Sequence, residues 1–542
     1  MKTSSRLLLS AALSLLAVPG FSRPTELTAR EAARFLDQAT WGPTPASVAA
    51  LQQTTVADWL NAQFALNTST LPAQPILDSN GKSNNNLAPV RAAFFQNAVN
   101  GQDQLRQRVA FVLSQIWVVS AVSAVSPAYA YPSYWQIFQD NAFGNYRDII
   151  QALTLSPAMG RYLDMANNNK ANAAAGTAPN ENYARELMQL FTLGLTELNP
   201  DGTPLLDSNN NPVPTYDQPV VTNMANVLTG WTYPTAPGAT AKTNNPAYYT
   251  GQMFAVDSEH DKTAKTIFSG ITIPAGGTAS TDLSAVLDAL MKHPTMAPFI
   301  SQQLIQHLVT SNPSAAYIRR VATVFENNGS GVTGDLKAVI TAILTDPEAR
   351  AGDSTSAAAN PVLRHPRGAR GGDSASAAMD SNFGHLREPI LFMANVLRGL
   401  NATITSTNNV AGNASNLGED LFKEPSVFSY FSPQYRTEKG LPGPEFQIYS
   451  TQTAADRADI VSTLLYGNLG GGTKVDLTPF IAAAGNTTDL LNYIASVFLH
   501  GEMSSALTTA ATSAVNAAAT PTEKAEAALY EVLTSGEYQI VQ

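Results

Sequence analysis

The sequence predicts a mainly α-helical protein, a large multi-helical domain with a few short hairpins. Amphipathic segments of helix length recur along all 542 residues, with apolar side chains three and four positions apart. Strand-like patterns are few and short, and no repeat of constant period indicates a solenoid. A chain of this length can also bury a large core.

Residues that typically begin or end a helix define where the predicted helices lie along the chain. Gly144 interrupts one long apolar pattern, and Pro294 and Pro298 separate two others, since neither residue type continues a helix well. The predicted helices cover residues 28–39, 105–120, 134–155, 180–194, 219–228, 283–293, 298–309, 314–328, 335–346, 386–400, 480–500 and 523–534. A strong turn at 199–202 precedes a small hairpin or ordered loop at 205–216.

Composition excludes several classes of function. The net charge is −10, which argues against a nucleic-acid partner, because phosphate binding depends on Lys and Arg. The chain has no cysteine, so disulfides, thiol nucleophiles, Cys-ligated zinc and iron–sulfur clusters are excluded. Only 14% of residues are charged, a content that suits an exported protein.

The N-terminus has the pattern of a secretory signal. Lys2 and Arg6 precede an apolar run at 7–18, which is too short to span a bilayer, and a cleavage-like region ends at Ser22. We therefore expect a signal peptide at 1–22 and an exported protein, periplasmic or secreted. No later stretch is long and apolar enough for a transmembrane helix.

The rest of the chain divides at an internal repeat. The run GDSTSAA at 352–358 recurs as GDSASAA at 372–378, which indicates a disordered, duplicated insertion at 351–382. The helical domain then has a first part at 23–350 and a second part at 383–542. Aromatic and turn residues at 424–433 are expected to form the rim of a pocket, whereas His293 and His307 are expected to be structural.

The helix opening at Asn180 carries an unusual polar face. Glu181 and Arg185 are four residues apart and can pair, as can Asn182 and Glu186. One interpretation is a solvated face with a weak salt bridge. The other is a polar pocket wall on which Arg185 orients a carboxylate.

A second polar motif is His260-Asp261 followed by Lys265. Adjacent side chains point to opposite sides of a strand, so the pair can face one site only from a loop. Together with Glu181 and Glu186, it would suit a divalent metal ion or general acid–base chemistry. The alternative is a structural loop in which Asp261 caps a turn and His260 contacts a backbone carbonyl.

These motifs carry a family resemblance. The sequence resembles the bacterial domain-of-unknown-function 1800 (DUF1800) family in five runs: YLD…PNENYARELMQLFTLG (162–194), LTGWTY (228–233), HDKTAKTIFSG (260–270), GHLREPILFMANVLRGL (384–400) and EPSVFSYFSPQYR…GPEFQI (424–448). The family name states that no activity is established, so the resemblance implies an exported setting and candidate residues but no reaction.

The resemblance has one departure. Relatives carry two His residues where this chain has Ser114-Gln115-Ile116-Trp117, so any metal role for those His residues does not transfer. Gln115 is expected to be a packed polar residue here.

Two functions remain open. The first is a hydrolase-like enzyme acting on an envelope or extracellular polymer, and the second is a non-catalytic cell-envelope binding or assembly protein. The resemblance suggests a sulfatase-like protein of the same pathway as a partner, and a polysaccharide is the expected ligand. The catalytic candidates are Glu181, Glu186, Arg185, His260 and Asp261, and the substrate-binding candidates are Asp164, Asn180, Asn182, Trp231 and Lys265. These groups would accommodate a divalent metal ion.

Overall fold

The computed structural model describes residues 27–353, 382–404, 408–467, 469–470 and 472–542. The predicted signal peptide at 1–22 and most of the predicted insertion at 351–382 lie outside the described residues. Within them, helices dominate and the paired strands are only two residues long, which confirms the predicted mainly α class.

The helices are short and numerous. The first group is α1 (Ala29–Ala39), α2 (Pro45–Gln52), α3 (Val56–Ala65), α4 (Ala88–Asn100), α5 (Gln104–Ile116), α6 (Ala130–Asn141), α7 (Tyr146–Thr154) and α8 (Pro157–Tyr162). The middle group is α9 (Asn182–Gln189), α10 (Gln218–Val227), α11 (Ala279–Met291), α12 (Met296–Leu308), α13 (Ala315–Glu326) and α14 (Leu336–Thr345). The last group is α15 (Pro389–Gly399), α16 (Asn408–Asn416), α17 (Thr451–Tyr466), α18 (Thr478–Ala483), α19 (Thr487–Phe498), α20 (Ser505–Ala517), α21 (Pro521–Thr534) and α22 (Gly536–Gln539).

Three antiparallel strand pairs complete the described structure. They are β1 (Trp231–Thr232) with β2 (Phe254–Ala255), β3 (Lys265–Thr266) with β4 (Thr272–Ile273), and β5 (His385–Leu386) with β6 (Ile540–Val541). The described residues also include the 3-10 turns η1 (Phe268–Gly270) and η3 (Pro444–Ile448). The expected hairpin at 205–216 takes the form of isolated antiparallel bridges, including Leu206 with Pro212.

Local chemistry explains where the helices start and stop. Thr28 and Glu31 form a reciprocal capping box at α1, in which each side chain accepts a hydrogen bond from the other residue's backbone N–H. The helix predicted at 480–500 is instead two, because Asn486 caps a new start at Thr487. Gly194 follows α9 with φ +73°, a conformation that favours glycine, and a Cβ there would lie 2.8 Å from the Phe299 ring.

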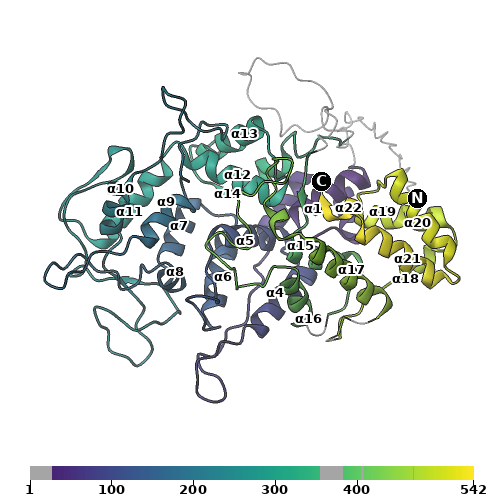
Figure 1. The fold of residues 1–542 in the computed structure, drawn as a ribbon, viewed down its shortest axis with the longest axis horizontal. Coiled ribbons are helices and arrows are strands. Elements are labelled where there is room, and N and C mark those ends of the chain that lie inside the picture. The colour runs from purple at the N-terminus through teal and green to yellow at the C-terminus, as the bar shows by residue number, and fades with distance from the viewer. Residues whose placement is uncertain (1–26, 354–381, 405–407, 468, 471) are drawn as a thin grey trace, which may run out of the picture.

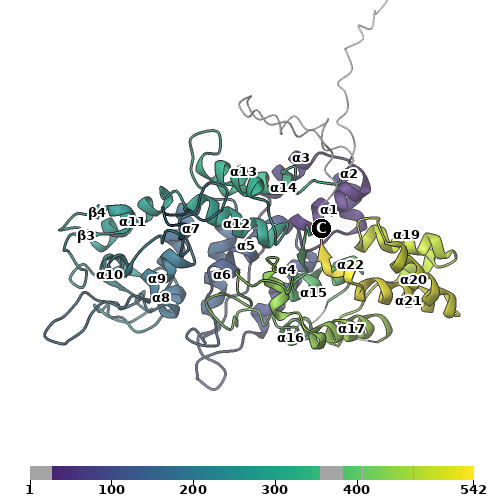
Figure 2. The same cartoon turned by 45° about the horizontal axis from the view of Figure 1, so that its top comes forward.

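The C-terminus lies beside the first described helix, in the middle of the molecule. In Figures 1 and 2, α7–α11 lie at one end and α18–α21 at the other, with α1, α5 and α15 between them. The C-terminus lies beside α1 in both views, and β5 pairs with β6 close to it. One hydrophobic core runs through these elements. Within the described residues, no helix combines the length and the apolar character needed to cross a membrane.

A buried charge network fastens α1 to the second half of the chain. Both terminal nitrogens of Arg387 donate to the Asp37 carboxylate, at 2.8 and 3.0 Å. Asn395 donates to the same carboxylate at 2.9 Å, and His500 Nε2 lies 3.0 Å from it. Burial alone would raise the pKa of Asp37, but Arg387 and His500 hold it well below its usual range.

Candidate functional site

The start of α9 holds its predicted polar residues in a local hydrogen-bond network. Asn180 Oδ1 accepts from the backbone N–H of Asn182 at 2.8 Å, and the Asn168 side chain binds the Asn180 backbone at both N–H and C=O. Asn182 Nδ2 lies 3.4 Å from Asp164 Oδ2, and Asp164 has φ +60°. Trp231 is buried nearby, and its carbonyl accepts from Asn167 at 2.7 Å.

Glu181 and Arg185 form the predicted pair on a partly open face. Their side chains are 31% and 38% exposed and lie 3.2 Å apart. Gln218 Nε2 and Thr222 Oγ1 each donate to Glu181 at 2.8 Å. These two hydrogen bonds, and then Arg185, lower the pKa of Glu181, so it is ionised at neutral pH and cannot serve as a proton donor.

His260 and Lys265 are buried and share one carboxylate partner. His260 Nε2 lies 3.2 Å from Asp282 Oδ2, and Lys265 Nζ donates to the same oxygen at 3.0 Å. His260 Nδ1 contacts the Thr229 carbonyl at 2.9 Å. Both ring nitrogens therefore face protein oxygens, which fixes the ring in the core.

Asp261 closes a turn. Its Oδ1 accepts from the Thr263 N–H at 2.8 Å and from the Thr263 hydroxyl at 2.6 Å. This is the arrangement that the structural alternative describes for the His260-Asp261 pair. No hydrogen bond or ion pair within the described part of the chain joins this loop to Glu181, and α10 packs against both α9 and β3. The structure thus brings His260, Asp261 and Lys265 together, apart from Glu181 and Arg185.

Glu186 differs from the other predicted carboxylates. It is half-buried, and its Oε2 is buried without a hydrogen-bond partner. Burial raises the pKa of Glu186, against a smaller lowering by Arg185. Leu190, one helical turn further on, lines a small cavity near the middle of the molecule, so Glu186 is the i−4 neighbour of a residue that lines that cavity.

We call this space the central cavity. It has a volume of about 40 Å³, and its lining residues are Gln115, Ile116, Leu190, Gln303, Gln306, His307, Val427, Phe428, Ser429, Phe431, Pro433, Pro444 and Glu445. Five of these residues, from Val427 to Pro433, belong to the segment 424–433 that was expected to form the rim of a pocket. The volume is close to the ~30 Å³ that one water molecule occupies in the liquid.

The central cavity holds a carboxyl group that keeps its proton at neutral pH. Glu445 is 2% exposed, and its Oε2 accepts from the Ser311 hydroxyl at 3.0 Å. Burial raises the pKa of Glu445 to about 8. Burial, reinforced by Arg108, lowers the pKa of His307 to about 3, so the imidazole beside it is neutral. The cavity therefore presents an uncharged acid next to an uncharged imidazole.

Two buried charged residues, Arg108 and Glu388, modify the effect of burial on these pKa values. Arg108 donates to the His307 carbonyl at 2.6 Å and lies 3.7 Å from Glu388. Gln115 is buried, as expected, and donates to Glu388 at 2.9 Å. Burial raises the pKa of both Glu388 and Glu419, and two close carboxyl groups in the core favour keeping a shared proton.

A further buried carboxyl group, that of Glu424, lies at the start of the segment 424–433. Burial raises the pKa of Glu424 to about 7, and the Tyr430 hydroxyl donates to its Oε1 at 3.1 Å. Burial raises the pKa of Tyr162 to about 12, and the nearby carboxyl groups of Glu424 and Glu186 add to this shift. Glu186 and Glu424 thus both lie near Tyr162.

Sequence reasoning missed Glu388, Glu424 and Glu445. All three lie in the long motifs at 384–400 and 424–448 that carry the family resemblance, and this position is the signal that could have identified them. The described residues contain no group of three His, Cys, Asp or Glu side chains able to hold a metal ion.

Fold and site together define a helical protein with several buried carboxyl groups whose pKa values are raised by burial. The chain belongs to the family described as protein of unknown function (DUF1800), whose model matches residues 34–540, as the sequence resemblance predicted. No curated protein and no solved structure matches the chain.

Proposed function

We propose that the protein is an exported, hydrolase-like enzyme that acts on an envelope or extracellular polysaccharide at the central cavity. The observation that carries the proposal is Glu445, a carboxylic acid that lines the cavity and retains its proton at neutral pH. Hydrolysis of a glycosidic bond needs such a group to protonate the leaving oxygen. The exported setting rests on the signal pattern at 1–22.

Glu186 is the complementary base in this proposal. Its environment leaves one carboxylate oxygen without a protein partner, and its raised pKa brings it nearer to neutral pH. Glycoside hydrolysis commonly uses two carboxyl groups, one as the acid and one as the base. Glu445 would donate to the leaving oxygen while Glu186 accepts a proton from the attacking water.

The size of the cavity determines how a polymer would bind. A space of about 40 Å³ admits a glycosidic oxygen or a water but no sugar ring. The sugar units would therefore lie across the rim, where the Phe428 side chain is 41% exposed. An exposed aromatic ring offers an apolar face against which the C–H groups of a sugar can pack.

A non-catalytic envelope binding or assembly protein is the second candidate. The observation that favours it is that His260 and Lys265 are paired in the core and Glu181 is satisfied by Gln218 and Thr222. In that case these residues have a structural role and take no part in a reaction. A sulfatase-like protein of the same pathway is the partner proposed in that case.

The test is release of reducing ends from peptidoglycan and from neutral and acidic glycans by the mature protein. Loss of a general acid costs on the order of 10²–10⁴-fold in rate, so Glu445→Gln should lose release by that factor. Glu438→Gln changes an exposed carboxylate in the same segment and should keep full release. Saturable binding without release by the wild-type protein would favour the binding role instead.

A further inference from the structure

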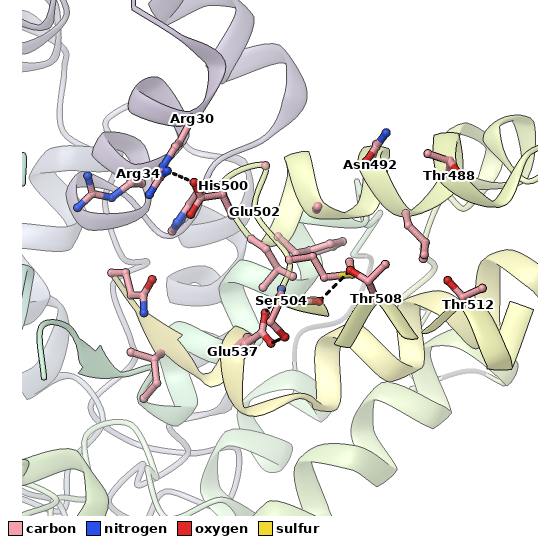
Figure 3. A pocket seen from close by; sticks show the side chains of 18 of the residues that line it. Arg30, Arg34, Thr488, Asn492, His500, Glu502, Ser504, Thr508, Thr512 and Glu537 are labelled. Carbon is pink, nitrogen blue, oxygen red and sulfur yellow. Dashed lines mark hydrogen bonds and ion pairs between the residues drawn. The ribbon is translucent and has the colours of Figure 1, made fainter. Parts of the chain in front are cut away.

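A second and much larger cavity is lined by other parts of the chain than the central cavity. We call it the C-terminal cavity; its volume is about 780 Å³, and α1, α19, α20 and the C-terminal residues enclose it (Figure 3). It shares no lining residue with the central cavity. Pockets that bind small molecules typically measure about 300–1,000 Å³, so its size suits a ligand.

The charged side chains that line this cavity already have protein partners. The pairs are Arg30 with Glu502, Arg34 with Asp353, His500 with Asp37, and Glu537 with Ser504. Figure 3 shows the Arg30–Glu502 contact at one side of the cavity and Ser504 beside Glu537. An ionic ligand would have to compete with an existing pair, because each charged side chain of the lining already has a partner.

The remaining polar lining consists of hydroxyl and amide groups from two helices. Thr487, Thr488 and Asn492 belong to α19, and Thr508 and Thr512 belong to α20. Within the described residues, the side chains of Thr487, Thr488, Asn492 and Thr512 make no hydrogen bond, and the Thr508 hydroxyl donates to the Ser504 carbonyl at 2.8 Å. Groups of these types can both donate and accept, as a ligand rich in hydroxyls requires.

His500 lines the same cavity in a fixed position. Its Nε2 faces the Asp37 carboxylate at 3.0 Å, which leaves Nδ1 as the ring nitrogen that can hydrogen-bond to a ligand. Asp37 is fixed in turn by Arg387 and Asn395, which holds the imidazole in one orientation. His500 also has φ +54°, an uncommon conformation for a residue with a side chain.

We propose that the C-terminal cavity binds an uncharged, polyhydroxylated ligand, the neutral sugar units of a polysaccharide. His500 would hydrogen-bond to one ligand hydroxyl, and the Thr and Asn side chains of α19 and α20 would bind others. Leu491 and Met503 add apolar surface for the C–H faces of the rings. This site is independent of the proposed acid–base chemistry and would anchor a chain rather than cleave it.

The test is titration calorimetry of the mature protein with cellohexaose, maltohexaose, xylohexaose and chitohexaose, and with the anionic hexagalacturonate. We expect saturable binding of at least one neutral hexasaccharide and weaker binding of hexagalacturonate. Thr512→Phe places a ring in the cavity and should weaken binding by about tenfold or more, equal to ~1.4 kcal/mol. Thr509→Phe, on an exposed position of the same helix, should leave affinity within about twofold.

Three results would overturn the proposal. They are no saturable binding of any neutral hexasaccharide, tighter binding of hexagalacturonate, or equal affinities for the Thr512→Phe and Thr509→Phe proteins. Glu445→Gln separates this proposal from the proposed function, since it should abolish hydrolysis but leave affinity at the C-terminal cavity unchanged.

Discussion

Replacement of Glu445 by Gln should change how stability depends on pH. Glutamine has nearly the same shape and can still accept the hydrogen bond from Ser311, but it does not ionise. Burial raises the pKa of Glu445 to about 8 from an ordinary value of 4.5. Between these values the unfolded chain has lost the proton and the folded protein keeps it. The unfolding free energy therefore falls as pH rises through this range.

The magnitude follows from the same two values. Each pH unit between about 5 and 7.5 should remove ~1.4 kcal/mol from the wild type relative to the Glu445→Gln protein. Over the whole interval from pH 4.5 to about 8, the wild type loses roughly 5 kcal/mol of unfolding free energy relative to the variant. This loss is complete above pH 8. Because Glu388 and Glu419 are present in both proteins, their own pH dependence largely cancels in the difference.

Urea unfolding at pH 5, 6, 7 and 8, followed by circular dichroism, measures this difference. The unfolding free energies can be compared only where the two proteins share the same m value. Glu438→Gln, on the exposed part of the same segment, is the matched control and should follow the wild type. A difference between wild type and Glu445→Gln that is constant within about 0.5 kcal/mol across this range would refute the reasoning.

Three further predictions concern the other charged groups. Lys265→Met leaves the buried Asp282 without its cation and should cost about 3 kcal/mol, seen as a lower urea midpoint; an unchanged midpoint would contradict the buried pair. Arg387 holds the pKa of Asp37 below its ordinary 3.8, so the stability from this pair is present above that value and lost as pH falls. Arg387→Met should therefore cost about 3–5 kcal/mol at pH 7 and weaken the acid dependence below pH 5, and an unaltered acid profile would contradict this. Glu181→Gln removes a partly exposed pair and should cost less than ~1 kcal/mol in the same assay, so a larger loss would show that the pair is not solvent-screened.

The fold class was predictable because it depends on local patterns. Apolar spacing located α9, although the helix ends at Gln189 and the turn before Gly194 is irregular. The predicted pairing of Glu181 with Arg185 also depends only on a four-residue spacing, and the structure contains it. Such features need no knowledge of distant contacts.

The central cavity was not predictable in the same way. The pKa of Glu445 depends on burial beside Ser311 and Glu388, and both lie dozens of residues away in the sequence. The role of His260, which lies in a loop, depends in the same way on Asp282, which belongs to α11. Local sequence indicates which groups can titrate, but tertiary packing determines which of them lose their water.

Infrared difference spectroscopy between the wild type and Glu445→Gln at pH 7 tests the central claim most directly. A protonated carboxylic acid and a carboxylate absorb at different C=O frequencies, so the difference spectrum isolates the state of this one group. We predict a carboxylic acid band that is present in the wild type, absent in the variant and lost as pH rises past about 8. A carboxylate band at pH 7 in its place would contradict the account, because Glu445 would then have no proton to donate.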